Sequence, residues 1–194
     1  TTGTPPGILG ELLAAALNNN AMVWRTGPAQ TELEEVTMAW LRDLIGLPDT
    51  FDGHINDTAS SSTLYALAAA REQLTDLRLR QEGMTGRDVP PLRVYCSEEA
   101  HSSIDKAAIT LGIGLNGVRR IPTRDEYQMD VDALHTAIQH DVAAGCRPMA
   151  VVATIGTTST TAIDHIPRIA ELCGEYNACL HVVAAYGGAA ALLP

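Results

Sequence analysis

The sequence contains a single lysine, Lys106, among its 13 basic residues, and its formal net charge is −10. A nucleic-acid-binding surface needs clustered Lys and Arg side chains to neutralise phosphates, and no such cluster is present, so we expect no nucleic-acid partner. No glycine-rich loop ends in a lysine, which excludes a P-loop nucleotide site. A G-x-G-x-x-G run at residues 112–117 follows a predicted helix and enters a predicted strand. This order is the reverse of the one that binds a dinucleotide.

Long apolar runs and paired cysteines are also absent. No apolar run approaches the length of a membrane span, so we expect no membrane association. The cysteines form no C-x-x-C pair, and we interpret them as reduced thiols of a cytoplasmic protein. They are Cys96, Cys146, Cys173 and Cys179. His135 and His140 are five residues apart and fall on different faces of a predicted helix, so no metal site is expected.

What the sequence does contain is enough apolar material for a core, 46% of 194 residues, in a pattern where helices and strands alternate. We predict helices over residues 7–19, 31–44, 58–81, 102–111, 131–144 and 163–176. The predicted strands are 54–57, 92–96, 117–121, 149–154 and 179–184. The strands after residue 90 are continuous apolar runs, which is typical of a sheet covered on both faces. The fold class is therefore α/β, a mainly parallel sheet with helices on both faces.

Small polar segments follow four of these strands. They are Asp57–Thr63, Glu98–Ser103, Thr154–Thr158 and Ala184–Gly188. The carboxyl ends of parallel strands share one edge, where open α/β sheets bind their ligands. We therefore expect residues 58–60, 101, 154 and 183–185 to lie close together.

Two of these segments have both a plain and a functional interpretation. Thr58-Ala59-Ser60 opens a helix, and from the residues alone an ordinary Ser/Thr cap is the simpler interpretation, although a helix start with free amides also suits a phosphate. His101 stands alone in a strand-to-helix loop, where a surface or capping histidine is the ordinary case.

The segment His181-Val182-Val183-Ala184-Ala185-Tyr186-Gly187-Gly188 resembles the His-Val-Asp-Ala-Ala-Tyr-Gly-Gly segment of the group II pyridoxal-phosphate-dependent decarboxylases, of the aromatic-L-amino-acid decarboxylase type. Three further motifs resemble that family in the same order: Thr58-Ala59-Ser60, Ala100-His101-Ser102-Ser103 and Thr154-Ile155-Gly156-Thr157-Thr158. The section from Gly27 to Glu34 also resembles it, so the resemblance spans nearly the whole chain.

The resemblance implies a fold-type I dimer and a carboxy-lyase that removes the α-carboxylate of an amino acid, with an aromatic substrate expected and pyridoxal phosphate as electron sink. By resemblance, Thr58, Ala59 and Ser60 bind the cofactor phosphate. His101 lies flat against the pyridine ring and helps to move protons, which makes it the expected catalytic residue. Thr154 contacts the cofactor, and Ala185 packs against the other ring face.

The sequence departs from the family pattern in two places. Val183 occupies the position of the Asp that binds the pyridine nitrogen, and the family's Schiff-base lysine would lie beyond this chain. We therefore interpret residues 1–194 as a central fragment of the large, cofactor-binding domain, without the N-terminal segment, the lysine region and the small C-terminal domain, and expect it to be inactive alone. Two alternatives stay open: a non-catalytic homologue that serves as a partner or binding subunit, and a lyase for another substrate such as glutamate or a sphingoid phosphate.

Overall fold

The computed structural model describes residues 3–193. These residues divide into two compact units, the first ending at Ile55 and the second beginning at Asn56. Within the described residues, no helix is long and apolar enough to cross a membrane.

The first unit contains two helices, α1 (Pro5–Leu17) and α2 (Pro28–Leu44). The predicted start of α2 is wrong. The Thr31-x-x-Glu34 pattern predicts a capping box there, but the helix begins one turn earlier, after Gly27, with Pro28 in its first turn. Thr31 is therefore an internal residue, and its hydroxyl donates to the carbonyl of Gly27 (3.1 Å).

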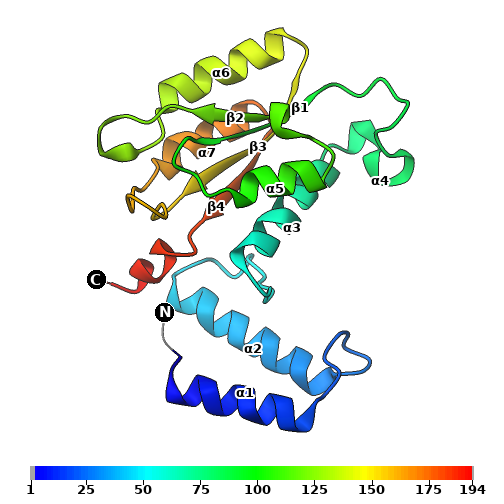
Figure 1. Cartoon of the computed structure of the whole chain (residues 1–194), viewed down its shortest axis with the longest axis vertical. Helices are drawn as coiled ribbons and strands as arrows, with labels where there is room; N and C mark the ends of the chain where they lie inside the picture. The colour runs from blue at the N-terminus through cyan, green and yellow to red at the C-terminus, as the bar shows by residue number, and fades with distance from the viewer. Residues whose placement is uncertain (1–2, 194) are drawn as a thin grey trace. The chain divides into compact units, whose positions relative to one another are not determined.

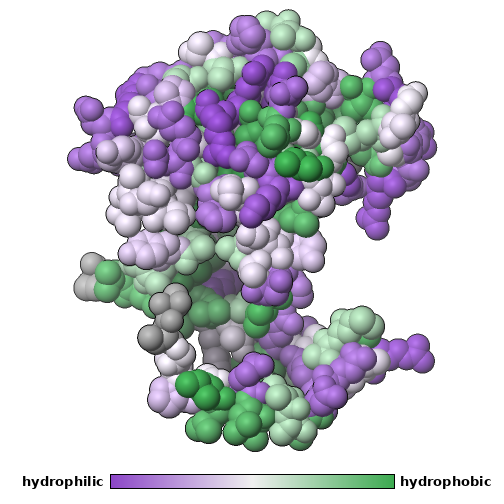
Figure 2. Space-filling model, in the orientation of Figure 1, coloured by the Kyte–Doolittle hydropathy of each residue, from purple (hydrophilic) through white to green (hydrophobic). Residues whose placement is uncertain are grey.

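The apolar stripe of α2 is exposed, although its helical periodicity predicts that this face is buried, and the apolar stripe of α1 is exposed as well. The large side chains of these stripes are 44–67% exposed. They are Ile8, Leu12, Leu13 and Leu17 of α1 and Leu33, Val36, Trp40, Leu41 and Leu44 of α2. Figure 2 shows apolar side chains gathered on the surface of the part that α1 forms. The prediction is wrong because no strand or further helix of the described part of this unit covers either stripe.

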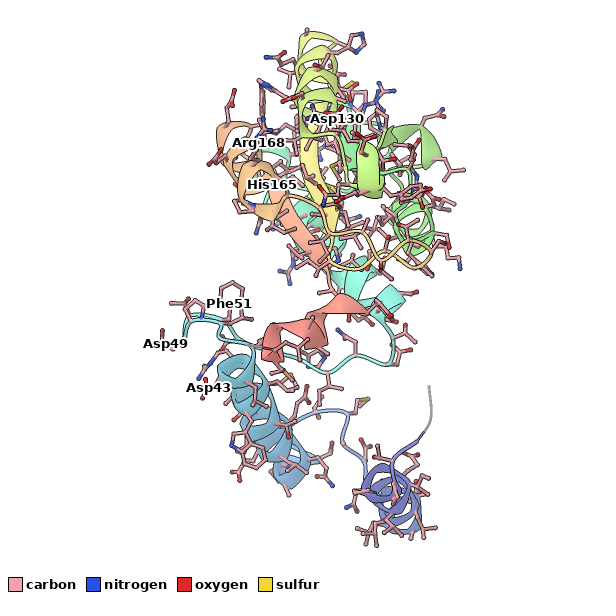
Figure 3. The ribbon with its side chains drawn as sticks, turned by 90° about the vertical axis from the view of Figure 1, so that its left-hand side faces the viewer. Asp43, Asp49, Phe51, Asp130, His165 and Arg168 are labelled. Atoms are coloured by element: carbon pink, nitrogen blue, oxygen red, sulfur yellow. The ribbon has the colours of Figure 1, made fainter. Side chains whose placement is uncertain are left out.

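The segment after α2 is irregular, and the strand expected at residues 54–57 is not formed. Asp43 lies in the last turn of α2, and Asp49 and Phe51 lie on the loop that follows (Figure 3). Further along, Glu34 accepts a hydrogen bond from the N–H of Ile55 (2.8 Å) and pairs with His54 Nδ1 (2.7 Å). The Glu34 carboxylate thus accepts the Ile55 N–H, which in a strand would donate to a carbonyl of a neighbouring strand.

The second unit is built on a four-stranded parallel sheet with the order β2-β1-β3-β4. The strands are β1 (Leu92–Ser97), β2 (Val118–Ile121), β3 (Arg147–Thr154) and β4 (Cys179–Val183). All three strand pairs are parallel, and Thr154 is in register with Val183 at the carboxyl edge. The parallel α/β fold predicted from the sequence is confirmed.

Helices cover both faces of this sheet (Figure 1). On one face lie α3 (Ala59–Glu72) and α5 (Ser103–Thr110), and on the other lie α6 (Val131–Ala143) and α7 (Ile166–Glu175). Alternate strand residues enter the two cores: Val94 and Cys96 pack towards α3 and α5, while Tyr95 packs towards α6 and α7. This double burial explains why the strands are apolar at successive positions.

The long helix expected from Thr58 to about Gln81 is interrupted. α3 ends at Glu72, and a 3₁₀ turn, η1 (Thr75–Leu77), precedes the short helix α4 (Leu79–Glu82). Arg78, between them, has the left-handed φ of 50°. The resulting turn allows both Leu74 and Leu79 to be buried, at 4% and 7% exposure. Packing of these two leucines explains why a continuous helix does not form.

Polar N-caps begin the two helices on the other face, Asp130 for α6 and His165 for α7, and Figure 3 labels both together with Arg168. The carboxylate of Asp130 accepts the N–H groups of Asp132 (2.9 Å) and Ala133 (3.1 Å) at the start of α6. His165 Nδ1 accepts the N–H of Arg168 (3.4 Å) at the start of α7. Three further 3₁₀ turns, η2 (Leu115–Gly117), η3 (Asp125–Tyr127) and η4 (Gly187–Leu192), complete the described elements.

Candidate functional site

A cavity of about 230 Å³ lies at the carboxyl edge of the sheet, within the second unit. Four segments that are distant in the sequence form its walls: the start of α3, the loop after β1, the loop after β3 and the turn after β4. The lining residues are Ala59, Ser60, Thr63, His101, Ser103, Thr154, Gly156, Thr157, Thr158, Val183, Ala185 and Tyr186. The structure therefore brings together six of the seven residues singled out from the sequence, and the seventh, Thr58, directly precedes α3.

The start of α3 supplies backbone donors to this cavity. Thr58 is the N-cap, and its Oγ1 accepts the N–H of Ser61 (3.2 Å). Ala59 and Ser60, the first two helical residues, line the cavity, and the N–H groups of such positions have no partner within the helix. Asn56 Nδ2 donates to Ser62 Oγ (3.0 Å) and ties the preceding segment to the helix. Thr58 thus caps the helix, and the neighbouring N–H groups lie at the positive end of a 14-residue helix. Such a helix start suits a phosphate.

His101 lies in the loop between β1 and α5 and contributes an exposed imidazole to the cavity wall. Its Nδ1 accepts the N–H of Ser103 (3.1 Å). Because Nδ1 is an acceptor, the neutral ring carries its proton on Nε2. The loop thus selects one tautomer, with a single N–H available for a ligand.

Thr154 ends β3 and is held by a buried carboxylate that the local sequence does not predict. Asp164 Oδ2 accepts the N–H of Thr154 (2.8 Å), and Asp164 Oδ1 accepts the N–H of Met129 (2.8 Å). Asp164 is 2% exposed, and its burial raises the pKa of the carboxyl above its usual range, although both hydrogen bonds act in the opposite direction. Asp164 thus fixes the end of β3 from behind the cavity. In the sequence Asp164 is a single Asp between Ile163 and His165, a pattern that predicts no partner.

The loop after β3 packs tightly against the turn after β4. The N–H of Gly187 donates to the carbonyl of Ile155 (3.1 Å), and a Cβ at position 187 would lie 2.5 Å from that oxygen. Gly156 has a φ of 83°, and a Cβ there would approach Gly187 and Tyr186 at 3.0 Å. These close contacts fix the two loops that carry Thr154 and Ala185 relative to one another.

Val183 presents an apolar side chain to the cavity at the end of β4. It is half-buried, and its carbonyl accepts the N–H of Ile155 (2.8 Å). Two positions earlier, His181 Nε2 lies 3.4 Å from Thr63 Oγ1, and burial lowers the pKa of this histidine. The site therefore combines a helix start with free amides, an imidazole and threonine hydroxyls, with an aliphatic group where β4 ends.

The sequence matches the family model described as "Pyridoxal-dependent decarboxylase conserved domain" over residues 1–194. The chain belongs to the pyridoxal-dependent decarboxylase family. Among curated relatives, it is 38% identical to histidine decarboxylase of Drosophila melanogaster and 37% identical to aromatic-L-amino-acid decarboxylase of Sus scrofa. These alignments cover 97% and 100% of this chain, but 23% and 41% of the two relatives.

Solved structures of decarboxylases have the same fold. Tryptophan decarboxylase of Catharanthus roseus, in complex with L-tryptophan, superposes with a TM-score of 0.90 at 36% identity, covering 100% of this chain and 42% of that one. The Oryza sativa TDC structure with PLP and tryptamine gives a TM-score of 0.90 at 34% identity, covering 98% and 40%. The chain thus spans about two fifths of these decarboxylases, and the predicted membership of the family is confirmed.

Pyridoxal phosphate fits the residues of this cavity at two of three points. The start of α3 offers amides to a phosphate, and His101 and Ala185 offer surfaces to a planar ring. The third point departs from the family pattern, since Val183 supplies no carboxylate for a pyridine nitrogen. Lys106, the single lysine, is an exposed residue of α5 and does not line the cavity. The contacts of individual residues with the cofactor stay predictions.

Proposed function

We propose that this chain forms the cofactor-holding part of a pyridoxal-phosphate-dependent amino-acid carboxy-lyase. The observation that carries the proposal is the joint position of the α3 start, His101, Thr154 and Ala185 around one cavity. Such a set offers a phosphate site, two surfaces for a flat ring and a hydroxyl in a space that four separate segments enclose.

Each residue then has a role in holding the cofactor. The N–H groups of Ala59 and Ser60 bind the phosphate, helped by the positive end of α3, while Thr58 keeps the helix start in place. His101 lies against one face of the ring and Ala185 against the other. The Thr154 hydroxyl contacts the ring substituents, with its backbone fixed by Asp164.

When bound, pyridoxal phosphate supplies an electron sink for loss of a carboxylate from the α-carbon of an amino acid. His101 is the group of this chain that can hold or deliver a proton beside that carbon, through Nε2, because Nδ1 is engaged by Ser103. Val183 cannot keep a pyridine nitrogen protonated, so the residues of this chain support the electron sink less than an Asp would.

The substrate we propose is an aromatic amino acid. Support comes from the relatives named as aromatic-L-amino-acid decarboxylase and tyrosine decarboxylase. Another relative is named as histidine decarboxylase, and a solved structure named as a glutamate decarboxylase domain, from Vibrio parahaemolyticus, has the same fold at 28% identity. Activity on histidine or glutamate is therefore the outcome that would redirect this part of the proposal.

The chain alone is proposed to bind the cofactor weakly and to lack activity, because its single lysine lies away from the cavity.

We further propose a homodimer, since the apolar stripes of α1 and α2 are exposed over an extent that is typical of surfaces buried by association. The cysteines are free, which agrees with a reducing compartment such as the cytoplasm.

A non-catalytic partner subunit is the second candidate, and Val183 is the observation that favours it. Such a protein would keep the fold and the phosphate site but would not assist the chemistry. The two candidates differ in whether a decarboxylation product forms when this chain is part of a protein that also carries a Schiff-base lysine.

Titration of the purified chain with pyridoxal phosphate, followed by borohydride reduction and mass spectrometry, tests the proposal. We expect saturable binding that Ser60→Pro weakens, since proline removes one amide donor of the phosphate site, and no reduced adduct at Lys106. A stoichiometric adduct at Lys106, or binding that is indifferent to the Ser60 change, would place the site elsewhere.

A further inference from the structure

The loop that carries His101 is held in place by an arginine from the neighbouring strand. This loop, residues 98–102, joins the end of β1 to the start of α5. Arg120 belongs to β2, which pairs with β1 at the outer edge of the sheet. Its guanidinium reaches over the loop from the side of β2.

Three contacts of Arg120 span the loop from the strand before it to the helix that follows. Nη1 donates to the carbonyls of Ser97 (3.2 Å) and Ala100 (3.1 Å), and Nη2 donates to Asp105 Oδ2 (2.7 Å). Ser97 is the last residue of β1, Ala100 directly precedes His101, and Asp105 lies in the first turn of α5. One side chain therefore sets the distance between the strand end, the peptide before the imidazole and the helix after it.

These contacts require the shape of arginine. A guanidinium presents five N–H donors in a fixed plane, whereas a lysine ammonium is a compact charge on a flexible stem. The Asp105 pair is about one third exposed on both sides, so by itself it contributes little to stability. The two carbonyl contacts give Arg120 a geometric role that an exposed ion pair does not have.

A second tie to the same loop is independent of Arg120. Glu98 Oε1 accepts both the N–H (3.1 Å) and the hydroxyl (2.9 Å) of Thr123, after β2. It fixes the beginning of the loop but makes no contact with the segment around His101. Loss of Arg120 would therefore leave the loop attached to β2, and would leave the Ala100 N–H on the Ser97 carbonyl (3.1 Å), while it removes the guanidinium from the Ala100 carbonyl next to His101.

We propose that Arg120 is a positioning residue that fixes the His101 imidazole over the cavity. It acts through the Ala100 carbonyl and Asp105, and it touches no residue of the phosphate site. The inference rests on the proposed function in that His101 is taken to contact the cofactor ring. Arg120 therefore governs ring contact and has no effect on phosphate binding.

The first measurement needs no cofactor and follows the ring itself by NMR in the ligand-free protein. In the wild type we expect the Nε2–H tautomer of His101 in one fixed orientation. Arg120→Ala should give averaged ring signals, while Arg120→Lys should restore them only in part. An unchanged His101 ring in Arg120→Ala would overturn the proposal, whether or not the protein binds pyridoxal phosphate.

The second measurement is a double-mutant cycle on the dissociation constant of pyridoxal phosphate. A lost ring contact is worth about three- to tenfold in affinity, so Arg120→Ala should weaken binding by about that factor. In a His101→Ala background the same change should have almost no further effect, and the affinity for inorganic phosphate should stay within about twofold throughout. Equal losses in both backgrounds would overturn the proposal.

Arg168→Ala is the matched control, because this arginine forms an exposed ion pair with Asp132 on the other face of the sheet (3.0 Å). It should change neither readout. If Arg120→Ala does not fold, Asp105→Ala removes one of the three contacts and should produce a smaller change of the same kind. Absence of pyridoxal phosphate binding in the wild type would contradict the proposed function, while the NMR measurement would still decide the role of Arg120.

Discussion

Replacement of Val183 by Asp should have opposite effects on the free protein and on its affinity for pyridoxal phosphate. The position ends β4, lines the cavity and is half-buried. Val and Asp have nearly the same branched shape, so the change alters hydrogen bonding rather than volume. Without a ligand, the carboxylate is half-buried at the end of a strand and loses part of its hydration, which costs about 1–2 kcal/mol of the free energy of unfolding.

For a protein of 194 residues this loss corresponds to a melting temperature lower by about 2–8 °C. With pyridoxal phosphate bound, the same carboxylate accepts a hydrogen bond from the protonated pyridine nitrogen. A hydrogen bond to a charged group contributes about 1.5–3 kcal/mol, so the affinity should rise about ten- to hundredfold.

Thermal unfolding and a spectrophotometric titration of the same preparations provide the test. Val183→Thr is the matched control, because it keeps the shape and adds a hydroxyl without a charge, and its affinity should stay within about threefold of the wild type. An Asp variant that binds pyridoxal phosphate no better than the Thr variant would refute the position assigned to the pyridine nitrogen.

Three further predictions concern the surroundings of the cavity. Asp164→Asn should lower the free energy of unfolding by about 1–3 kcal/mol in urea, because an amide NH₂ would face one of two backbone donors; an unchanged midpoint would contradict this. Burial lowers the pKa of His181 in the folded state. As the pH falls from about 6.5 towards that lowered pKa, the unfolded state binds a proton that the folded state does not, so the free energy of unfolding should fall by at most about 1.4 kcal/mol per pH unit. His181→Asn should remove this slope between about pH 7.5 and 5, and equal slopes would refute the assignment. Gly187→Ala should cost about 1–3 kcal/mol, because its Cβ would meet the Ile155 carbonyl, whereas Gly188→Ala should cost less; equal losses would argue against that contact.

The sequence predicted the sheet well because burial on both faces leaves a clear pattern. The four strands expected after residue 90 are all formed, with ends within two residues of the expected ones, although β2 carries Arg119 and Arg120 and is not an apolar run. The parallel pairing and the edge where polar segments gather followed from the rules for parallel sheets, whereas the strand order β2-β1-β3-β4 was not predicted. The family was identified from short motifs at that edge, where the backbone must approach a ligand closely.

The failures occurred where tertiary contacts override local patterns. The helical periodicity of α2 predicted a buried face, but periodicity cannot show whether a partner surface is present. Good helix formers predicted a continuous helix to Gln81, but burial of Leu74 and Leu79 requires a turn between them.

Parts of the site could not be predicted for the same reason. Asp164 holds Thr154 across ten residues, and Arg120 contacts the His101 loop across twenty or more. Neither contact leaves a pattern in the local sequence.

A crystal structure of the protein soaked with pyridoxal phosphate tests the central claim most directly. The account predicts the phosphate within hydrogen-bond distance of the Ala59 and Ser60 N–H groups, the ring between His101 and Ala185, and the pyridine nitrogen towards Val183. Pyridoxal phosphate bound outside this cavity, or bound within it with the phosphate away from the start of α3, would contradict the account.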